Sequence, residues 1–337
     1  MKASDARVAL RAELGISTDH RVARERFLVT GSEGCIGAWT VRNLIAAGFA
    51  TVALDLEPTG RRLAKILNPD PSHNLNHVAG DLRDSELVER VVNEHQITRI
   101  VHLAALQVPF VAADPVLGGE VNVVGTIRVF EAVRRANGLV RGMSYASSAA
   151  AIGPSAAPHE PETLYGAYKM CNEHSARIYA RDYATPSIGL RPCIVYGPAR
   201  DQGMTAALTH AMKAAVLGIP FRIPFGGQID AQYAQDVASA FIRCALVDGV
   251  EGAPVYDLHG DAVTVADFVD LIRSECPDAE ITHEDKPIPG NVTVDDTDLI
   301  EMLGGLPKTS LAVGVHRSIE TFGELARAGK LSADELP

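Results

Sequence analysis

The stretch "TGSEGCIG", residues 30–37, decides the fold of this chain. Its glycines, Gly31, Gly34 and Gly37, follow an apolar run at 26–30 and precede apolar residues at helical spacing over 36–48. Glycine allows the backbone to turn tightly and to approach a phosphate closely, and a helix N-terminus offers free N–H groups to an anion. A strand, a glycine-rich turn and a helix in this order predict a dinucleotide site. The alternative is an ordinary strand-to-helix turn.

An acidic residue near the end of the second strand completes this pattern. Asp55 closes the predicted strand 51–55, and its carboxylate can accept hydrogen bonds from both hydroxyls of an adenosine ribose. The same carboxylate would repel a 2′-phosphate, and the next residue is Leu56 rather than an arginine or lysine. The sequence therefore favours NAD over NADP. Arg61 and Arg62 leave NADP open, because a loop that folds back would bring one of them to a phosphate.

Short apolar runs alternate with helical patterns through the first 198 residues, which predicts an α/β fold with a Rossmann-type doubly wound parallel sheet. The later pattern is less regular and predicts a smaller α+β C-terminal lobe. We expect an N-terminal extension (1–25), an NAD-binding domain with the catalytic residues (26–198), and a mainly substrate-binding lobe (199–337) from which some segments return to the sheet. The expected strands are 26–30, 51–55, 75–81, 99–105, 139–148, 187–197 and 253–260, and the expected helices are 36–48, 84–95 (Asp84 as N-cap), 119–138, 164–183, 204–218, 236–246, 264–275 and 313–329.

Composition excludes several classes of protein. The 337 residues are 47% hydrophobic and 22% charged, as in a globular protein, and the net charge of −11 argues against nucleic acid as a partner. No apolar run is long enough to cross a membrane, and the polar N-terminus does not resemble a signal peptide. Five dispersed cysteines predict reduced thiols in the cytoplasm, and no His or Cys spacing indicates a metal site. The expected partner is a small-molecule substrate.

Several further motifs occur in a fixed order along the chain. They are Asp81-Leu82, "HLAA" (102–105), "NVVGT" (122–126), "SYASSAA" (144–150), "YGAYK" (165–169) and "LRPCIVYGP" (190–198). With the glycine-rich loop, they resemble the extended short-chain dehydrogenase/reductases, or NAD-dependent epimerase/dehydratase family, over about residues 26–325. The resemblance implies a homodimer formed through the helices at 119–138 and 164–183. It also implies that NAD contacts Gly31, Gly34, Cys35, Ile36, Gly37, Asp55, Leu56, Asp81, Leu82, Leu103, Ala104, Ala105, Asn122, Tyr165, Lys169 and Pro192.

The family pattern Tyr-x-x-x-Lys fits Tyr165 and Lys169 alone, because Tyr168 is adjacent to the lysine. Residues four apart share one face of a helix, so the ammonium is expected to lower the pKa of the Tyr165 phenol toward neutrality. The resemblance implies that Lys169 also binds the nicotinamide ribose. It assigns Ser148 to the reacting oxygen of the substrate, with Ser147 as the alternative if the register shifts by one residue.

Departures from the family pattern concern the substrate. Ala149 and Ala150 replace the Asp-Glu pair of family dehydratases, so dehydration is not expected. Ile194 and Ile229 stand where nucleotide-sugar members usually have Asn and Arg, which removes donors for a diphosphate. We therefore expect a smaller substrate, such as a sugar, sugar acid or hydroxy acid. Its candidate contacts are Gln107, Ser148, Arg200 and Gln232, although the loops at 198–205 and 226–232 are equally consistent with surface loops without a specific role.

Three functions follow from this pattern. The leading hypothesis is an NAD-dependent dehydrogenase that oxidises a secondary alcohol, and the second is an epimerase of the same fold. The third is a non-enzymatic NAD-binding regulator, which the retained Tyr165 and Lys169 argue against. Asn122 is interpreted either as an organiser of backbone near the site or as a capping or core amide. His102 is interpreted as a packed core histidine.

Overall fold

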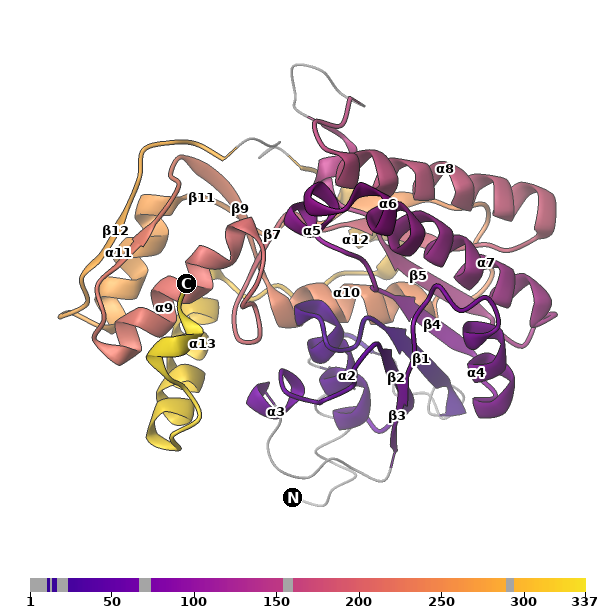
Figure 1. Ribbon diagram of the computed structural model, residues 1–337, viewed down its shortest axis with the longest axis horizontal. Helices are drawn as coiled ribbons and strands as arrows, with labels where there is room; N and C mark the ends of the chain where they lie inside the picture. Colours follow the sequence, from indigo (N-terminus) through magenta and orange to yellow (C-terminus); the bar gives the residue numbers. More distant parts are fainter. Residues whose placement is uncertain (1–10, 13, 17–23, 67–73, 154–159, 289–293) are drawn as a thin grey trace.

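The structure is a computed structural model that describes residues 11–12, 14–16, 24–66, 74–153, 160–288 and 294–337 (Figure 1). Its centre is a seven-stranded sheet in the order β10-β6-β5-β4-β1-β2-β3, in which every neighbouring pair is parallel. β1 is buried from Phe27 to Thr30, as expected for a strand covered on both faces. The strands are β1 (Arg26–Thr30), β2 (Ala50–Asp55), β3 (Leu75–Ala79), β4 (Arg99–His102), β5 (Gly142–Ala146), β6 (Ile188–Arg191) and β10 (Val255–Asp257).

Helices cover both faces of this sheet, which confirms the predicted doubly wound fold. α2 (Cys35–Ala46) and α10 (Ala234–Leu246) pack together on one face, and α4 (Leu87–His95), α7 (Gly125–Arg135) and α8 (Leu164–Tyr183) cover the other (Figure 1). Both α10 and β10 come from the chain beyond residue 198. This part of the chain therefore contributes to the central sheet as well as to the lobe.

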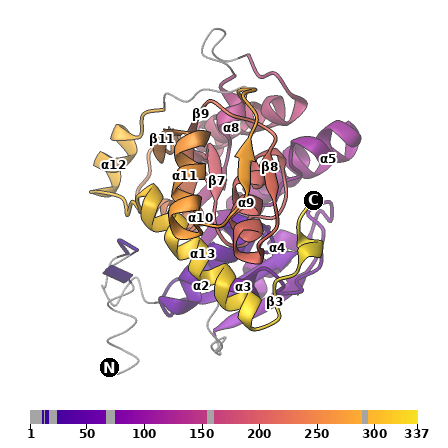
Figure 2. The same cartoon turned by 90° about the vertical axis from the view of Figure 1, so that its left-hand side faces the viewer.

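The C-terminal lobe has two small sheets (Figure 2). It also has its own apolar core. One sheet has the order β11-β9-β7, and the other pairs β12 with β8. Its strands are β7 (Ile194–Tyr196), β8 (Phe221–Ile223), β9 (Gln228–Tyr233), β11 (Asp261–Thr264) and β12 (Ile281–His283). Its principal helices are α9 (Ala207–Leu217), α11 (Val265–Glu275) and α13 (Leu311–Arg327). Short helices elsewhere in the described residues include α3 (Leu63–Ile66), α5 (Val108–Ala113), α6 (Pro115–Gly119), α12 (Thr297–Leu303), η3 (Ala149–Ala151), η4 (Met204–Ala206) and η5 (Ala333–Glu335).

Three expected elements differ in the structure. The strand expected at 187–197 is two strands in different sheets, because Pro192 cannot donate to a ladder and the chain leaves the central sheet there. The helix expected at 119–138 is a continuation of α6 through a π-helical turn, η2 (Glu120–Val124), into α7. Asp84 is not the N-cap of α4, which begins at Leu87 after Glu86. The Asp84 carboxylate instead accepts the Glu86 N–H at 3.0 Å.

Most of the expected N-terminal extension, residues 1–10, 13 and 17–23, lies outside the described residues. Its described part packs on the nucleotide domain, where Leu14 and Ile16 are buried and Arg11 Nε donates to Ala47 O at 2.8 Å. Within the described ranges, we find no helix with the length and apolar character needed to span a membrane.

Candidate active site

The glycine-rich loop has the geometry of a phosphate cradle. Gly31 has a φ of +71°, and a Cβ there would lie 2.6 Å from Ala104 N. A Cβ at Gly37 would lie 2.0 Å from Gly31 O, so the turn between β1 and α2 closes only with glycine at both positions. Gly34 caps α2 without a side-chain bond, which leaves the first N–H groups of the helix free for an anion. These residues fit the pyrophosphate of a dinucleotide.

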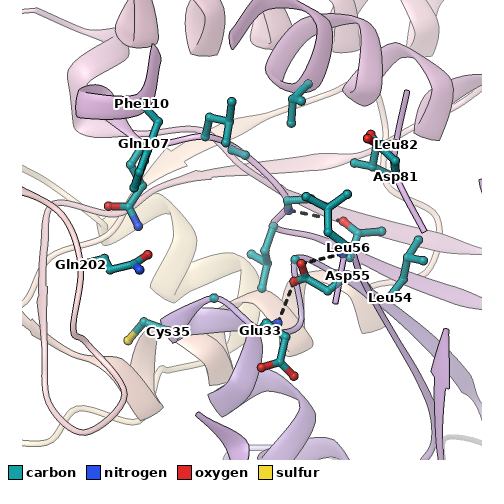
Figure 3. A pocket seen from close by; sticks show the side chains of 18 of the residues that line it. Glu33, Cys35, Leu54, Asp55, Leu56, Asp81, Leu82, Gln107, Phe110 and Gln202 are labelled. Atoms are coloured by element: carbon teal, nitrogen blue, oxygen red, sulfur yellow. Dashed lines mark hydrogen bonds between the residues drawn. The ribbon is translucent and has the colours of Figure 1, made fainter. Parts of the chain in front are cut away.

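Asp55 is held with its carboxylate toward the same loop (Figure 3). Its Oδ2 accepts the Glu33 N–H at 2.8 Å and its Oδ1 accepts the Leu56 N–H at 2.8 Å, which fixes the carboxylate at the end of β2. Gln107 and Gln202 lie on the other side of the pocket in Figure 3. This cavity has a volume of about 370 Å³, and the predicted residues that line it are Gly31, Gly34, Cys35, Asp55, Leu56, Asp81, Leu82, Leu103, Ala104, Ala105, Gln107 and Arg200.

A second cavity of about 320 Å³ contains the predicted catalytic residues. It shares glycine-loop residues, Gln107 and Arg200 with the first, so the two cavities are parts of one cleft. The cleft follows the carboxyl ends of the central strands, where parallel α/β sheets bind their ligands. The predicted residues that line the second cavity are Gly31, Gly34, Cys35, Ile36, Gly37, Leu103, Ala105, Gln107, Ser148, Tyr165, Lys169, Pro192 and Arg200.

The structure brings Ser148, Tyr165 and Lys169 together. Tyr165 and Lys169 lie one turn apart on α8, which begins at Leu164 because Thr163 caps it by accepting the Gly166 N–H at 3.1 Å. Ser148 and Tyr165 line the same cavity, and the Ser148 side chain is near enough to the Tyr165 phenol to oppose the rise of its pKa. Lys169 Nζ lies 5.6 Å from the centroid of the Tyr165 ring and donates to Ala146 O at 2.6 Å. Tyr168 does not join this group, because its hydroxyl donates to Pro115 O at 2.9 Å.

The electrostatics of this group differ from the expectation. Burial raises the pKa of Tyr165, and the Ser148 hydrogen bond and the charge of Arg200 oppose this only in part. The expected lowering of the Tyr165 pKa by Lys169 is therefore wrong for the protein alone. Burial lowers the pKa of Lys169 to about 8, although the charge of Glu173 opposes this effect. Lys169 thus remains mainly protonated at pH 7 despite being only 3% exposed.

Behind the catalytic group lies a buried ion pair that fixes the strand ends. Glu173, one turn after Lys169, accepts from Arg191 Nε at 2.7 Å and from Nη2 at 2.6 Å. The Ser147 hydroxyl also donates to Glu173, so Ser147 is directed away from Tyr165 and Ser148 faces it. His102 is buried as expected. Burial and the charge of Lys169 lower the His102 pKa to about 3, so its ring is neutral.

Two predicted site residues do not line the cleft. The side chain of Asn122 is buried, accepts the Leu106 N–H at 2.7 Å and donates to Leu106 O at 2.9 Å. It organises the backbone of the loop after β4 and has no place among the lining residues of either cavity, so the prediction that it contacts NAD is not supported.

Gln232 is the second of these residues. It is 3% exposed on β9, its Oε1 accepts the Cys193 N–H at 3.1 Å, and its Nε2 donates to Asp230 Oδ1 and to Leu258 O. The segment at 226–232 is therefore not a polar loop at the site. Both the oxygen and the nitrogen of the Gln232 amide are hydrogen-bonded within the protein and do not face a substrate. Ile229 on the same strand is fully buried in the core of the lobe, whereas Ile194 does line the second cavity.

Sequence reasoning missed other lining residues. Glu33, whose N–H orients Asp55, was not predicted. Arg62 was named as a residue that a folded-back loop could bring to a phosphate, and it does line the cleft, but its acidic partner there, Asp201, was not predicted. The Arg61-Arg62 dipeptide was a visible signal for this contact, but its acidic partner lies 139 residues away. An apolar wall formed by Phe110, Leu117 and Val121 also lines the first cavity, and no motif marks it.

Together, the fold and the cleft define a dinucleotide-binding enzyme with a Ser-Tyr-Lys group beside the cofactor cradle. The model of the NAD dependent epimerase/dehydratase family matches residues 27–256 of this chain. The chain belongs to this family, which confirms the resemblance, the type of enzyme and NAD as the family cofactor.

Known relatives and solved structures are similar to this chain over most of its length. The chain is 30% identical over 315 residues to a UDP-glucose 4-epimerase of Mycolicibacterium smegmatis, which covers 88% of this chain and 98% of that protein. A UDP-glucose 4-epimerase of Thermus thermophilus, solved in complex with NAD, is 27% identical with a TM-score of 0.74 over 88% of this chain and 98% of that one. A consensus L-threonine 3-dehydrogenase, 22% identical with a TM-score of 0.77 over 89% of this chain and 99% of that one, shows the fold alone.

Proposed function

We propose that the protein transfers hydride between NAD and the secondary alcohol or ketone of a small sugar, sugar acid or hydroxy acid. The observation that carries this proposal is that Ser148, Tyr165 and Lys169 line one cavity, which is continuous with the dinucleotide cradle. A proton donor and acceptor beside the nicotinamide end of a dinucleotide site is the arrangement that alcohol oxidation requires.

The proposed chemistry assigns a step to each residue. NAD, when bound in the cradle, would supply the acceptor for the hydride of the carbinol carbon. Tyr165 takes the proton of the same hydroxyl group, so that an alcohol and NAD⁺ give a ketone, NADH and one proton. Ser148 hydrogen-bonds the reacting oxygen, and Lys169 holds a positive charge below the phenol and is available to the ribose hydroxyls. Because the protein alone raises the pKa of Tyr165, the phenol is expected to ionise only in the complex with the cationic nicotinamide.

The lining of the second cavity supports a substrate with one anionic group. Lys169 and Arg200 are the cations among its described lining residues, and Val108, Ile194 and Met204 provide much of the remaining wall. Arg200 donates to Thr205 Oγ1 at 3.1 Å through one Nη, while its Nε is buried and has no hydrogen-bond partner. A substrate carboxylate would pair with the charge that the Arg200 guanidinium presents at the cavity wall, whereas a diphosphate normally needs several charge-assisted bonds.

An epimerase is the second candidate function. The observation in its favour is that the relative from M. smegmatis, which is similar over almost its full length, is a UDP-glucose 4-epimerase. An epimerase returns the hydride to its substrate and releases no NADH. The two functions therefore differ in net redox change.

The separating experiment measures NADH and product together. Purified protein is mixed with NAD, and in parallel with NADP, and with a panel of sugars, aldonic and uronic acids, hydroxy acids and UDP-glucose. A rise in absorbance at the NADH wavelength with an acid or sugar supports the proposal, and Tyr165→Phe should lower its rate by about 10²- to 10⁴-fold. Conversion of UDP-glucose to its C4 epimer without net NADH would instead establish the epimerase. Activity that survives in Tyr165→Phe would refute the assigned mechanism.

We also propose a homodimer formed by the outer face of α6, η2 and α8. Val116 (73% exposed), Val124 (40%), Leu164 (49%) and Ile178 (43%) are large apolar side chains exposed on these elements. Figure 1 shows α6, α7 and α8 along one outer side of the sheet, where a second copy has access to them. Light scattering should give a dimer mass and Ile178→Asp a monomer. A monomeric wild-type protein at micromolar concentration would refute the interface.

A further inference from the structure

The guanidinium of Arg62 joins two segments that lie far apart in the sequence. Its Nε and Nη2 donate to Asp201 Oδ1 at 2.8 and 2.6 Å, and its Nη1 donates to Glu33 O in the glycine-rich loop. The two side chains are only 12% and 17% exposed. Arg61 adds a second cation 3.6 Å from Asp201 Oδ2. The contact is thus better buried and has more donors than an ordinary surface ion pair.

This ion pair lies in the wall of the cofactor cavity. Glu33, Arg62 and Asp201 all line the first cavity. Asp201 belongs to the segment 198–205, which we call the substrate loop and which also places Arg200 and Thr205 in the second cavity. The pair therefore fastens the loop of the proposed substrate side to the loop of the phosphate side.

The substrate loop is anchored at its start by another long-range contact. Trp39 Nε1 on α2 donates to Pro198 O at 2.8 Å. A second ion bridge leaves the Arg62 segment, because Lys65 Nζ lies 2.6 Å from Glu335 Oε2, which also accepts from Lys213 at 3.0 Å. Neither Lys65 nor Glu335 lines the cofactor cleft. Of the two ion bridges that leave the Arg62 segment, the Arg62–Asp201 pair is therefore the one that lies beside the dinucleotide cavity.

We propose that Arg62 and Asp201 form a clamp that holds the substrate loop against the phosphate loop and slows the release of the dinucleotide. The proposal rests on NAD binding in the proposed function. A dinucleotide that occupies both cavities contacts both loops, so its departure requires the loops to separate and the ion pair to break.

The test measures the dissociation rate of NADH from the full-length protein. NADH is displaced by excess NAD, and its fluorescence is followed through energy transfer from Trp39, the single tryptophan of the chain. Arg62→Gln and Asp201→Asn should each release NADH about tenfold faster, which corresponds to ~1.4 kcal/mol. The effects in the double variant should be clearly less than additive, because both changes remove the Arg62–Asp201 pair, whereas the Arg62–Glu33 and Arg61–Asp201 contacts are each lost in one single variant. Rising salt should accelerate release from the wild type but not from Asp201→Asn.

Glu335→Gln is the matched control, because it breaks the other bridge of the same segment outside the cleft. Its release rate should stay close to that of the wild type. Unchanged rates in both single variants, additive effects in the double variant, or equal acceleration in Glu335→Gln would each overturn the clamp. A wild-type protein that binds no NADH would instead refute the proposed function. Circular dichroism and the unfolding midpoint establish that each variant is folded.

Discussion

Replacing Lys169 with methionine should make the protein more stable and almost inactive. The Lys169 ammonium is 3% exposed, and burial lowers its pKa from 10.5 to about 8. At 1.36 kcal/mol per pKa unit, keeping this charge inside the fold at pH 7 costs ~3 kcal/mol. Methionine has a similar length and no charge, but it loses the bond to Ala146 O, worth ~1 kcal/mol net. Glu173 keeps its partner Arg191. We therefore expect a gain in unfolding free energy of ~2 kcal/mol.

The pH dependence gives this prediction a sign. Between the folded pKa of about 8 and the unfolded value of 10.5, the unfolded chain binds more protons at Lys169, so this group makes the wild type more stable as pH rises. The destabilisation is complete below pH 8 and disappears above 10.5. The difference between Lys169→Met and the wild type should thus be largest at pH 7 and should shrink toward pH 10.

Urea unfolding of cofactor-free protein at several pH values measures this difference, because bound NAD would add its own stabilisation. Lys213→Met is the control. Lys213 is equally buried at 2% exposure, but it is paired with Glu335 at 3.0 Å, so its replacement should give no gain. The rate of the Lys169→Met enzyme should fall at least ~100-fold. A variant that is less stable than the wild type at pH 7 would refute the reasoning, since the buried ammonium would then be a net stabiliser.

Two further predictions concern the cradle and the lobe. Gly37→Ala should raise the NAD dissociation constant, measured by calorimetry, at least ~100-fold. The reason is that the new Cβ would lie 2.0 Å from Gly31 O and would displace the loop. An NAD affinity within a few-fold of the wild type would contradict the assignment of this loop as the phosphate cradle. Gln232→Leu should lower the unfolding free energy by ~3 kcal/mol, because Cys193 N and Leu258 O lose their buried partner. It should leave KM unchanged, and a selective rise in KM with normal stability would restore Gln232 as a substrate contact.

The cofactor half of the cleft was predictable because its residues follow strands directly. Asp55 is the last residue of β2, and the glycine-rich loop and Leu103 follow β1 and β4 directly. The carboxyl ends of parallel strands meet at one edge of the sheet. Local spacing therefore specifies spatial proximity. Tyr165 and Lys169 were predictable for a similar reason, since one turn of helix fixes their separation.

Polar residues of the lobe were not predictable in the same way. The segment 226–232 has the composition of a loop, but Asp230 and Gln232 lie in the buried strand β9 and satisfy each other and His259 through hydrogen bonds. A polar side chain is normally exposed, and only a tertiary partner shows that it is buried and paired. The prediction that Asn122 contacts NAD failed for the same reason. Both the oxygen and the nitrogen of its side-chain amide are hydrogen-bonded to the backbone of Leu106.

The substrate side therefore depends on contacts that local sequence does not encode. Ile229 lies in the core of the lobe, so its departure from the nucleotide-sugar pattern removes an anchor without creating a pocket wall. Arg200 reaches both cavities because Trp39 and Arg62 hold the substrate loop, and these contacts span 159 and 139 residues. Tyr165 and Lys169 can serve many alcohols. Under the proposed function we therefore expect the substrate loop to select the alcohol, and a change at Asp201 to alter cofactor release and substrate affinity together.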